Sequence, residues 1–263
     1  MASHEIKTVT LIGAGKLANH LGNALKKHGF GIPQVYNRTP SQGQRLAKKL
    51  NATYTDDLNK LSFKSDLFII AVTDRAIPEI TGRLSLDGEL VVHTSGTVAM
   101  SVLSKTTQRS GVLYPLQTFT GKGLVSFQKI PVCLEAAQEN DLRLLADLAG
   151  KISEKIYFIN SERRSYLHLA AVFAANFPHF LHTVAADLMK EHNLPLEMVR
   201  PLILQVARNT RYEDLFDLQT GPAVREDFPV IEQHRCLLSD HPEYQKIYDL
   251  ITNSIIQYKK NHE

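Results

Sequence analysis

A glycine-containing turn near the start of the chain joins an apolar segment to a helical one. The apolar run 8–12 leads directly into Gly13-Ala14-Gly15-Lys16-Leu17-Ala18, and a helical pattern continues to His28. Gly13 permits a tight turn, Gly15 lets the backbone approach a pyrophosphate, and the N–H groups that open the helix supply donors for phosphate oxygens. This order predicts a dinucleotide site whose phosphate loop comprises Gly13, Ala14, Gly15, Lys16 and Leu17. A glycine-rich turn without a ligand is the alternative.

Short β-branched or apolar runs recur up to about residue 158. They comprise 6–12, 34–36, 67–72, 90–93, 111–114, 131–134 and 155–159. Parallel strands need crossover connections, which are usually helices, so strands that alternate with helical segments predict a mostly parallel α/β sheet. From Ser161 onward, long segments of helical period replace the strands, over 162–191, 195–212, 222–238 and 242–258. We therefore expect a nucleotide-binding α/β domain over residues 1–158. An all-α domain over 159–263 is expected to bind substrate and to mediate dimerisation.

The composition is that of an ordinary folded protein, with 43% apolar and 22% charged residues in a chain of 263. A net charge of +3 from scattered basic residues gives no broad field for nucleic acid, which favours a small-molecule ligand. The chain has two cysteines, Cys133 and Cys236. Two cysteines cannot form a disulfide framework or a four-cysteine zinc site, so a reducing, cytoplasmic location is expected.

The longest stretch without a formal charge runs from Ser165 to Ala186. It is long enough to span a bilayer, but it contains several polar residues and a proline: His168, Asn176, Pro178, His179 and His182. These residues favour a helix buried at a domain or subunit interface over a membrane helix. We therefore expect a homodimer formed through the helical domain and no membrane partner.

The end of the second predicted strand indicates which nucleotide binds. Sites that prefer NAD place an acidic residue there for the ribose hydroxyls, whereas an arginine accommodates a 2′-phosphate. The sequence Val35-Tyr36-Asn37-Arg38-Thr39-Pro40-Ser41 contains no acid. Arg38 can form charge-assisted bonds to the phosphate, with Asn37, Thr39 and Ser41 as neutral donors. The pattern favours NADP; in the alternative, Arg38 only solvates the end of a strand.

Two later loops follow predicted strands and are expected to border the cofactor, because ligands of open α/β sheets lie outside the carboxyl ends of the strands. The first loop provides Val72, Thr73 and Asp74, and the second provides Thr94, Ser95 and Gly96. Ser95 is also a candidate catalytic residue, because a small hydroxyl beside an unhindered backbone suits a place where nicotinamide and substrate meet. In the alternatives, Asp74 is a plain N-cap and Ser95-Gly96 is a tight turn.

These motifs resemble the Rossmann domain of NADP-dependent reductases related to pyrroline-5-carboxylate reductase, the β-hydroxyacid dehydrogenases and the deazaflavin-linked NADP oxidoreductases. The resemblance rests on GAGKLA at 13–18, YNRTP at 36–40, AVTD at 71–74 and HTSGT at 93–97. The second half resembles a bacterial family of Rossmann-like proteins with a C-terminal helical domain of unknown function, through 166–177 and 220–227 with His234 following. The resemblance implies an NADP-dependent oxidoreductase that transfers a hydride between NADPH and a small carbonyl or imine.

One position departs from the pattern of the β-hydroxyacid dehydrogenases. Their first long helix after the Rossmann domain presents a lysine and, one turn later, an asparagine to the substrate. Asn176 matches that asparagine and is a candidate catalytic residue, but Val172 stands where the lysine would be. Their acid therefore cannot be carried over to this chain.

A histidine offers a replacement for the missing acid. At 100° per residue, His168 and His179 lie about 20° apart around an uninterrupted helix, and Asn176 lies about 80° from His168. His168 is the candidate proton donor, because hydride addition leaves a negative charge that an acid near neutral pKa can quench. A core histidine with a backbone or subunit partner is the alternative. His179 and His182 have no acid or cysteine beside them, so no metal is predicted.

Further candidates for substrate binding are Gln117, Thr220, Gly221, Arg225 and His234. Arg225 can clamp a carboxylate or phosphate, or it can form a surface pair with Asp227 beside a helix that starts at Pro222. The leading interpretation is an NADP-dependent reductase or dehydrogenase. The alternative is a non-catalytic NADP-binding sensor or structural protein, since fold alone does not decide between them.

Overall fold

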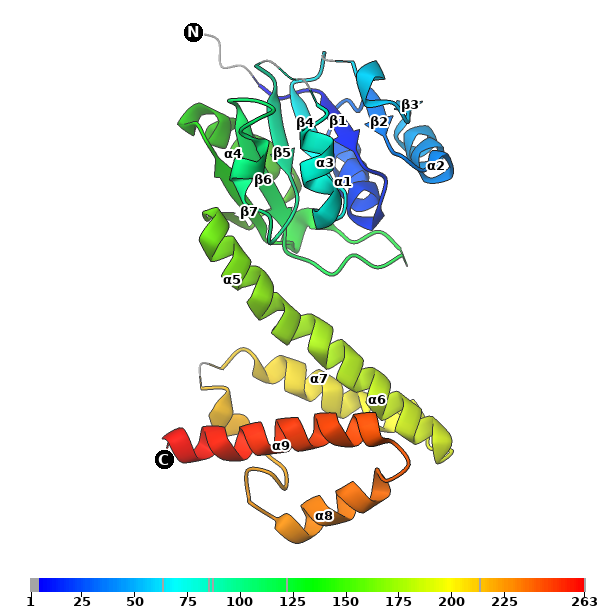
Figure 1. Ribbon diagram of the computed structural model, residues 1–263, viewed down its shortest axis with the longest axis vertical. Coiled ribbons are helices and arrows are strands. Elements are labelled where there is room, and N and C mark those ends of the chain that lie inside the picture. The colour runs from blue at the N-terminus through cyan, green and yellow to red at the C-terminus, as the bar shows by residue number, and fades with distance from the viewer. Residues whose placement is uncertain are drawn as a thin grey trace. The chain divides into compact units, whose positions relative to one another are not determined.

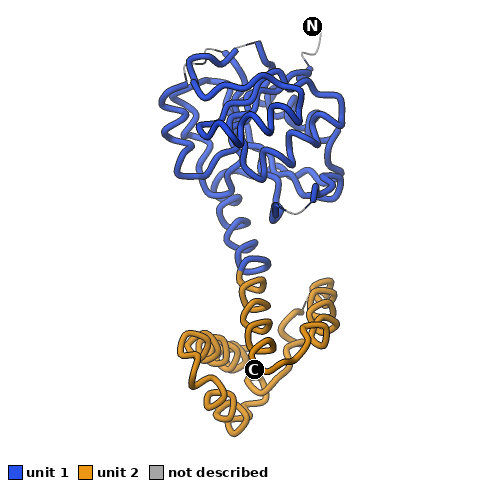
Figure 2. The backbone as a smooth tube through the Cα atoms, turned by 90° about the vertical axis from the view of Figure 1, so that its right-hand side faces the viewer, with its two compact units in different colours: residues 1–176 blue, residues 177–263 orange. Residues whose placement is uncertain are grey.

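The computed structural model describes residues 5–62, 64–84, 86, 88–121, 123–212 and 214–262. The chain divides into two compact units, Met1–Asn176 and Phe177–Glu263, which we call the first and second units (Figure 2). The described strands all lie in the first unit, and the last of them ends at Phe158. Division by packing does not test where a substrate-binding domain begins, so the domains 1–158 and 159–263 stay a prediction.

A mixed sheet of eight strands forms the centre of the first unit (Figure 1), in the order β3-β2-β1-β4-β5-β6-β7-β8. The strands are β1 Val9–Ile12, β2 Gln34–Tyr36, β3 Thr53–Thr55, β4 Leu67–Ile70, β5 Leu90–His93, β6 Ser110–Pro115, β7 Val132–Ala136 and β8 Ile156–Phe158. All neighbours pair in parallel except β6 and β7, which are antiparallel. The predicted fold class, a mostly parallel Rossmann-like sheet followed by a helical region, is confirmed.

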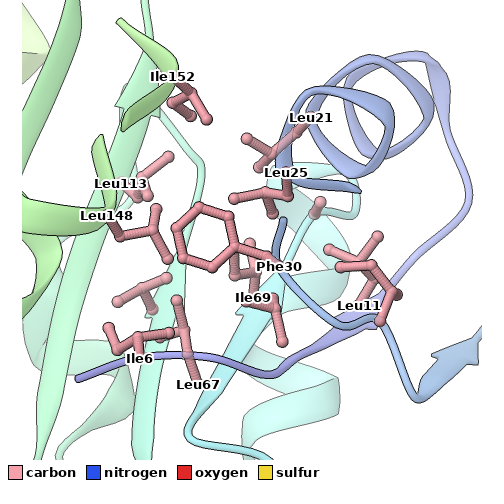
Figure 3. Close-up of a cluster of buried hydrophobic side chains, with 14 of the residues drawn as sticks. Ile6, Leu11, Leu21, Leu25, Phe30, Leu67, Ile69, Leu113, Leu148 and Ile152 are labelled. Atoms are coloured by element: carbon pink, nitrogen blue, oxygen red, sulfur yellow. The ribbon is translucent and has the colours of Figure 1, made fainter. Parts of the chain in front are cut away.

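Helices cover both faces of the sheet and form the second unit. They are α1 Lys16–Lys27, α2 Pro40–Leu50, α3 Ile77–Thr81, α4 Glu139–Ile152, α5 Ser161–Ala171, α6 Phe177–Glu191, α7 Arg200–Asn209, α8 Phe228–Leu237 and α9 Pro242–His262. Alternate residues of each central strand point to opposite faces. Leu11 and Ile69 therefore pack in one buried cluster, under α1, α2 and α4 (Figure 3), whereas Ile12 and Ile70 pack in another with α3.

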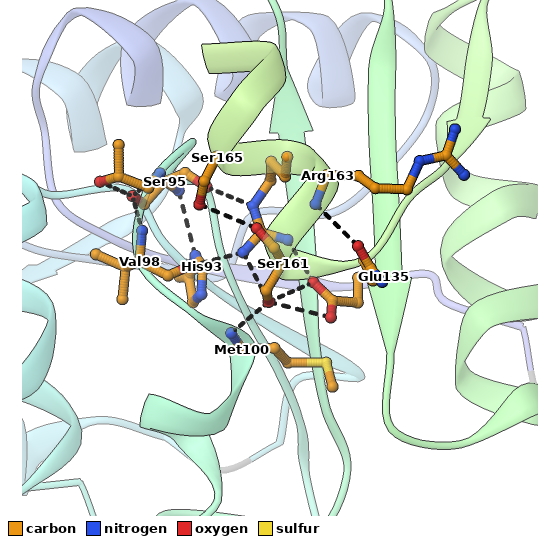
Figure 4. Close-up of polar contacts among 11 residues, drawn as sticks. His93, Ser95, Val98, Met100, Glu135, Ser161, Arg163 and Ser165 are labelled. Carbon is orange, nitrogen blue, oxygen red and sulfur yellow. Dashed lines mark hydrogen bonds and ion pairs between the residues drawn. The ribbon is translucent and has the colours of Figure 1, made fainter. Parts of the chain in front are cut away.

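A buried arginine ties α5 to the carboxyl end of the sheet. Arg164 is 1% exposed, and its Nε donates to the carbonyl oxygen of Ser95 at 3.1 Å while Nη2 donates to that of Val98 at 2.6 Å. Its Nη1 pairs with the carboxylate of Glu135 on β7. Ser161 bridges the same carboxylate and the backbone N–H of Met100 (Figure 4). Because breaking a buried ion pair leaves an uncompensated charge, at a cost of about 3–5 kcal/mol, this network fixes α5 against the sheet.

A π-helical turn, Val172–Asn176, ends the first unit directly before α6. Pro178, two residues later, has no N–H to donate to the preceding turn, and such interruptions favour local widening of a helix. The angles of an uninterrupted helix therefore do not hold between His168 and His179.

The residues from α5 to α6 form a long apolar helical run. Over Ser161–Glu191, the most apolar 18-residue window has a mean hydropathy of 1.3 and none of it is buried in the structure. By length and composition alone, this run can cross a membrane. Its large exposed side chains are Tyr166, Leu169, Phe173, Phe177, Phe180 and Leu181. Burial of this helix at a domain or subunit interface therefore stays a prediction.

In the second unit, the helix expected to start at Pro222 begins instead at Phe228. Residues 222–226 form turns, Gly221 has φ 110° and Glu226 has φ 52°. The N–H of Asp227 donates to the carbonyl of Pro222 at 2.9 Å. A left-handed residue stops a helix from propagating, so Pro222 opens a turn rather than a helix.

Candidate functional site

A cavity of about 490 Å³ lies at the carboxyl ends of β1, β2 and β4. Its lining residues are Gly13, Ala14, Gly15, Lys16, Leu17, Tyr36, Asn37, Arg38, Thr39, Gln42, Asp56, Ala71, Val72, Thr73, Ala76, Glu79, Ile80 and Arg83. The predicted phosphate loop, the β2 end and the first residues after β4 are thus brought together. This volume is within the usual range for small-molecule sites, about 300–1,000 Å³.

The two glycines of the phosphate loop serve different purposes. Gly13 has φ +118°, and a Cβ there would lie 2.3 Å from the carbonyl oxygen of Ala71. A Cβ on Gly15 would meet nothing within 4 Å, so the space over this residue is open to a ligand. Gly15 is also the N-cap of α1, which has no side-chain cap and no acid in its first turn. These features suit a diphosphate, because the N–H groups of a helix start attract anions.

Asn37 supports the phosphate loop from β2. Its Oδ1 accepts from the N–H of Ala14 at 3.0 Å, and its Nδ2 donates to the carbonyl of Thr39 at 2.8 Å. The sequence predicted Asn37 as a neutral donor to a phosphate. In the structure the side chain links the phosphate loop to the turn that carries Arg38, and its role as a phosphate donor stays a prediction.

Besides Lys16 of the phosphate loop, four charged residues line this cavity, and the sequence motifs indicated only one of them, Arg38. Arg38 lies as predicted beyond β2, but Asp56 follows β3, a strand that sequence reasoning missed. Glu79 and Arg83 come from α3 and the turn after it. The β-branched and aromatic Thr53-Tyr54-Thr55 was the signal that could have located β3 and hence Asp56.

The remaining predicted cofactor residues, Asp74, Thr94, Ser95 and Gly96, do not line this cavity. The carboxylate of Asp74 accepts from the hydroxyl of Thr97 at 2.6 Å, and Thr73 is the N-cap of the 3-10 turn that follows. The alternative role of Asp74 as an N-cap is therefore wrong, and Asp74 ties the loop after β4 to the loop after β5.

The hydroxyl of Ser95 is used within its own turn. Its oxygen accepts from the N–H of Thr97 at 3.1 Å and of Val98 at 2.9 Å, and the residue is 5% exposed. The N–H of Ser95 donates to Nδ1 of His93 at 3.2 Å. Ser95 therefore shapes the turn that presents Gly96, while its roles in catalysis and cofactor binding stay predictions.

His168 packs directly against Gly96. A Cβ on Gly96 would lie 2.6 Å from Nδ1 of His168, so only glycine leaves room for this ring. The hydroxyl of Tyr114, on β6, lies 3.0 Å from the same Nδ1. The structure thus brings His168 and Gly96 together and adds Tyr114, whose contact with His168 the sequence did not indicate because the two residues lie 54 positions apart in the chain.

The ionisation of the neighbouring groups follows from burial. Burial raises the pKa of Tyr114 to about 12, so the phenol stays protonated near neutral pH. Burial, and secondarily the charge of Arg164, lowers the pKa of His93 to about 4. His93 is therefore neutral and is no proton donor at neutral pH, whereas His168 is partly exposed. Nδ1 of His168 faces Tyr114, which leaves Nε2 as the ring nitrogen that can reach a ligand.

The other candidate residues lie apart from this pair or in the second unit. Asn176 is exposed at the end of the π-helical turn, and Gln117 is exposed with its Oε1 accepting from the N–H of Thr118. In the second unit, Nδ1 of His234 lies 2.9 Å from the hydroxyl of Tyr248. The exposed or half-exposed candidates there are Thr220, Gly221, Arg225 and His234. Within the described part of that unit, no ion pair joins Arg225 to Asp227, so that alternative is wrong.

Among the residues that the structure describes, no group of three or more His, Cys, Asp or Glu side chains is placed to hold a metal ion. His179 and His182 thus have no third ligand in that part of the chain.

Comparisons with known proteins cover nearly the whole chain. Residues 3–118 match the family described as a Rossmann-like domain, and residues 130–255 match a domain of unknown function, DUF2520. The chain is 39% identical to a candidate NADP oxidoreductase of Bacteroides fragilis, with a TM-score of 0.89 over 96% of this chain and 98% of that one. No curated protein matches the chain in sequence.

More distant solved structures share the fold. An imine reductase of Myxococcus stipitatus in complex with NADP+ is 17% identical, with a TM-score of 0.66 over 97% of this chain and 94% of that one. A pyrroline-5-carboxylate reductase of Coxiella burnetii is 16% identical, with a TM-score of 0.59 over 98% of both chains. The chain is thus structurally similar to NAD(P)-dependent oxidoreductases.

Proposed function

The chain belongs to the family of Rossmann-like proteins that carry the C-terminal DUF2520 domain, and we propose that it is an NADP-dependent oxidoreductase that reduces a small carbonyl or imine. The resemblance inferred from the motifs to this family, and to pyrroline-5-carboxylate reductase, is confirmed. The family leaves the substrate open, so the reaction is argued from the residues of the first unit.

The cavity in the first unit supports NADP as the cofactor. The open space over Gly15 and the uncapped start of α1 suit the diphosphate, and Arg38 suits a 2′-phosphate. When bound, the nicotinamide donates or accepts the hydride. The protein's own residues must then orient the acceptor and supply a proton.

One observation carries the assignment of the proton donor: the ring of His168 packs on Gly96 with its Nδ1 held by Tyr114. When the imidazole is protonated, Nδ1–H donates to the Tyr114 oxygen and Nε2–H stays available as the acid. A reduced carbonyl or imine develops negative charge on its oxygen or nitrogen, and Nε2–H can donate to that atom. His168 is thus proposed as the acid in place of the lysine that is absent at Val172.

The substrate is proposed to be a small molecule that meets His168 beside Gly96. Asn176, Gln117, Thr220, Gly221, Arg225 and His234 stay proposals as substrate ligands, and a small-molecule substrate requires neither nucleic acid nor a membrane. A screen of aldehydes, ketones and cyclic imines with NADPH tests the function directly by following loss of cofactor absorbance. Turnover supports the reductase, whereas tight NADPH binding without turnover of any class supports the alternative, a non-catalytic NADP sensor or structural protein.

A further inference from the structure

A second arginine lines the cofactor cavity, on a different element from Arg38. Arg83 lies in the turn after α3, and its backbone N–H donates to the carbonyl of Ile80 at 3.0 Å. Ile80 and Ile77 anchor α3 in the buried cluster on that face of the sheet. The backbone that carries Arg83 is therefore fixed, while its side chain is exposed at the cavity.

The charge around the cavity is distributed over both of its walls. The cationic side chains are those of Lys16, Arg38 and Arg83, and the anionic ones are those of Asp56 and Glu79. Lys16 belongs to the phosphate loop, so it faces the expected diphosphate. Arg38 and Arg83 are left to balance any further anionic group, and they approach it from β2 and from α3.

Arg83 has a partner that binds it only weakly. Its Nη1 lies 3.9 Å from Oε1 of Glu79, and the two side chains are 57% and 61% exposed. Exposed pairs of this kind contribute little stability, because water screens them and both side chains lose entropy. The guanidinium is therefore free to exchange Glu79 for a stronger anion.

We infer that Arg83 is a second specificity-determining residue, which acts with Arg38 to select a dinucleotide that carries a 2′-phosphate; this rests on the proposed use of NADP. A phosphate dianion has three acceptor oxygens, so it can accept from two guanidinium groups at once. A ribose hydroxyl carries no charge to compete with Glu79. Arg83 therefore stays with Glu79 when the 2′-phosphate is absent. The cavity thus distinguishes NADPH from NADH through two arginines, Arg38 and Arg83, on different elements.

Calorimetric titration of the whole protein with NADPH and with NADH tests this inference without requiring a substrate. Arg83→Gln is expected to weaken NADPH binding by about five- to tenfold and to change NADH binding by less than about twofold, as expected for loss of one charge-assisted contact. Glu79→Gln is expected to strengthen NADPH binding by about twofold, because it removes a competitor for Arg83 and a repulsive charge.

A matched control is Arg75→Gln, since Arg75 is exposed in the 3-10 turn before α3 and does not line the cavity. It is expected to leave both affinities unchanged. Equal weakening of NADPH and NADH by Arg83→Gln would mean that Arg83 contacts the shared adenosine and would overturn the inference. Unchanged NADPH binding in that variant would overturn it as well.

The experiment separates this inference from the proposed function. If the wild-type protein binds neither dinucleotide, the proposed cofactor is wrong and the inference falls with it. If the wild type binds NADPH and only Arg38→Gln weakens it, the cofactor stands and the role of Arg83 is wrong. Circular dichroism of each variant confirms that the fold is retained.

Discussion

The hydroxyl of Tyr114 lies 3.0 Å from Nδ1 of His168, which joins a strand to a helix 54 residues further along the chain. Tyr114 is 9% exposed and belongs to a buried cluster with Val112 and Cys133. The ring of His168 is held between this hydroxyl and the backbone of Gly96. Its orientation is therefore set before any ligand arrives, which is the arrangement expected for a positioned acid.

His168→Ala is expected to lower kcat by about 10²-fold or more, the usual contribution of a positioned proton donor. NADPH affinity should not change, because His168 does not line the cofactor cavity. Steady-state kinetics on a substrate found in the screen, together with calorimetry, checks both. His192→Ala, an exposed residue of the second unit, is the control. Full activity in His168→Ala would reject His168 as the acid.

Tyr114→Phe removes the hydroxyl and keeps the ring in its buried cluster. We expect kcat to fall by about fivefold, because the loss of one hydrogen bond, about 1 kcal/mol, frees the imidazole to rotate. The pH dependence of kcat should also shift, since the variant changes the hydrogen bonding of Nδ1. A variant that loses thermal stability but keeps the wild-type pH profile would show that Tyr114 only supports the fold.

Arg38→Ala tests the choice of nucleotide. The wild type is expected to bind NADPH at least about tenfold more tightly than NADH, a difference of about 1.4 kcal/mol. The substitution should remove most of that difference, because it removes the arginine that the sequence motif places at the 2′-phosphate. Calorimetry with both dinucleotides provides the measurement. Equal affinities in the wild type would refute the preference for NADP.

The buried His93 is expected to lower the free energy of unfolding in acid. The pKa of His93 is lowered from 6.5 to about 4 in the folded protein. Between pH 6.5 and 4, the His93 imidazole is therefore protonated in the unfolded chain but stays neutral in the folded one. Its stabilisation is complete above pH 6.5 and falls as the pH drops toward 4, by about 3 kcal/mol in total. Urea unfolding at a series of pH values measures this slope.

His93→Asn provides the comparison, because Asn keeps an acceptor for the N–H of Ser95 but does not titrate. The variant should unfold with a shallower pH dependence between 6.5 and 4. The same slope in both proteins would show that other groups cause the acid sensitivity.

A homodimer is the expected solution state. The run 161–191 exposes aromatic residues such as Tyr166 and Phe173, and the second unit adds large exposed side chains such as Leu202 and Leu237. Apolar surface on this scale marks an interface. Light scattering at micromolar concentration is expected to give twice the mass of one chain. A monomer, or recovery of the protein in the membrane fraction, would contradict it.

Features that depend on residues adjacent in the chain were predictable from the sequence. The phosphate loop and the strands β1, β4 and β5 are contiguous apolar or glycine patterns, so local sequence specifies them. β3 was missed because Thr53-Tyr54-Thr55 is a short strand at the edge of the sheet with little apolar character. The start of α8 was misplaced because a proline opens a helix and a turn equally well, and only the positive φ values of Gly221 and Glu226 distinguish the two.

The candidate site depended on contacts between distant parts of the chain. Tyr114 and His168 are 54 residues apart, and Asp74 and Thr97 are 23 apart. No local pattern reports such a pair, because it is created by the order of strands in the sheet. That His168 needs a hydrogen-bond partner was predictable, since a polar residue in a long apolar run requires one.

The buried Arg164 determines which parts of the site can move together. It binds the carbonyl oxygens of Ser95 and Val98 and the carboxylate of Glu135, one helical turn before His168. The proposed acid, His168, is thereby attached to the sheet whose strand ends line the cavity, and both lie in the first unit. Substitutions within residues 177–263 are therefore expected to leave the setting of the proposed proton donor unchanged, because the contacts that hold His168 come from the first unit.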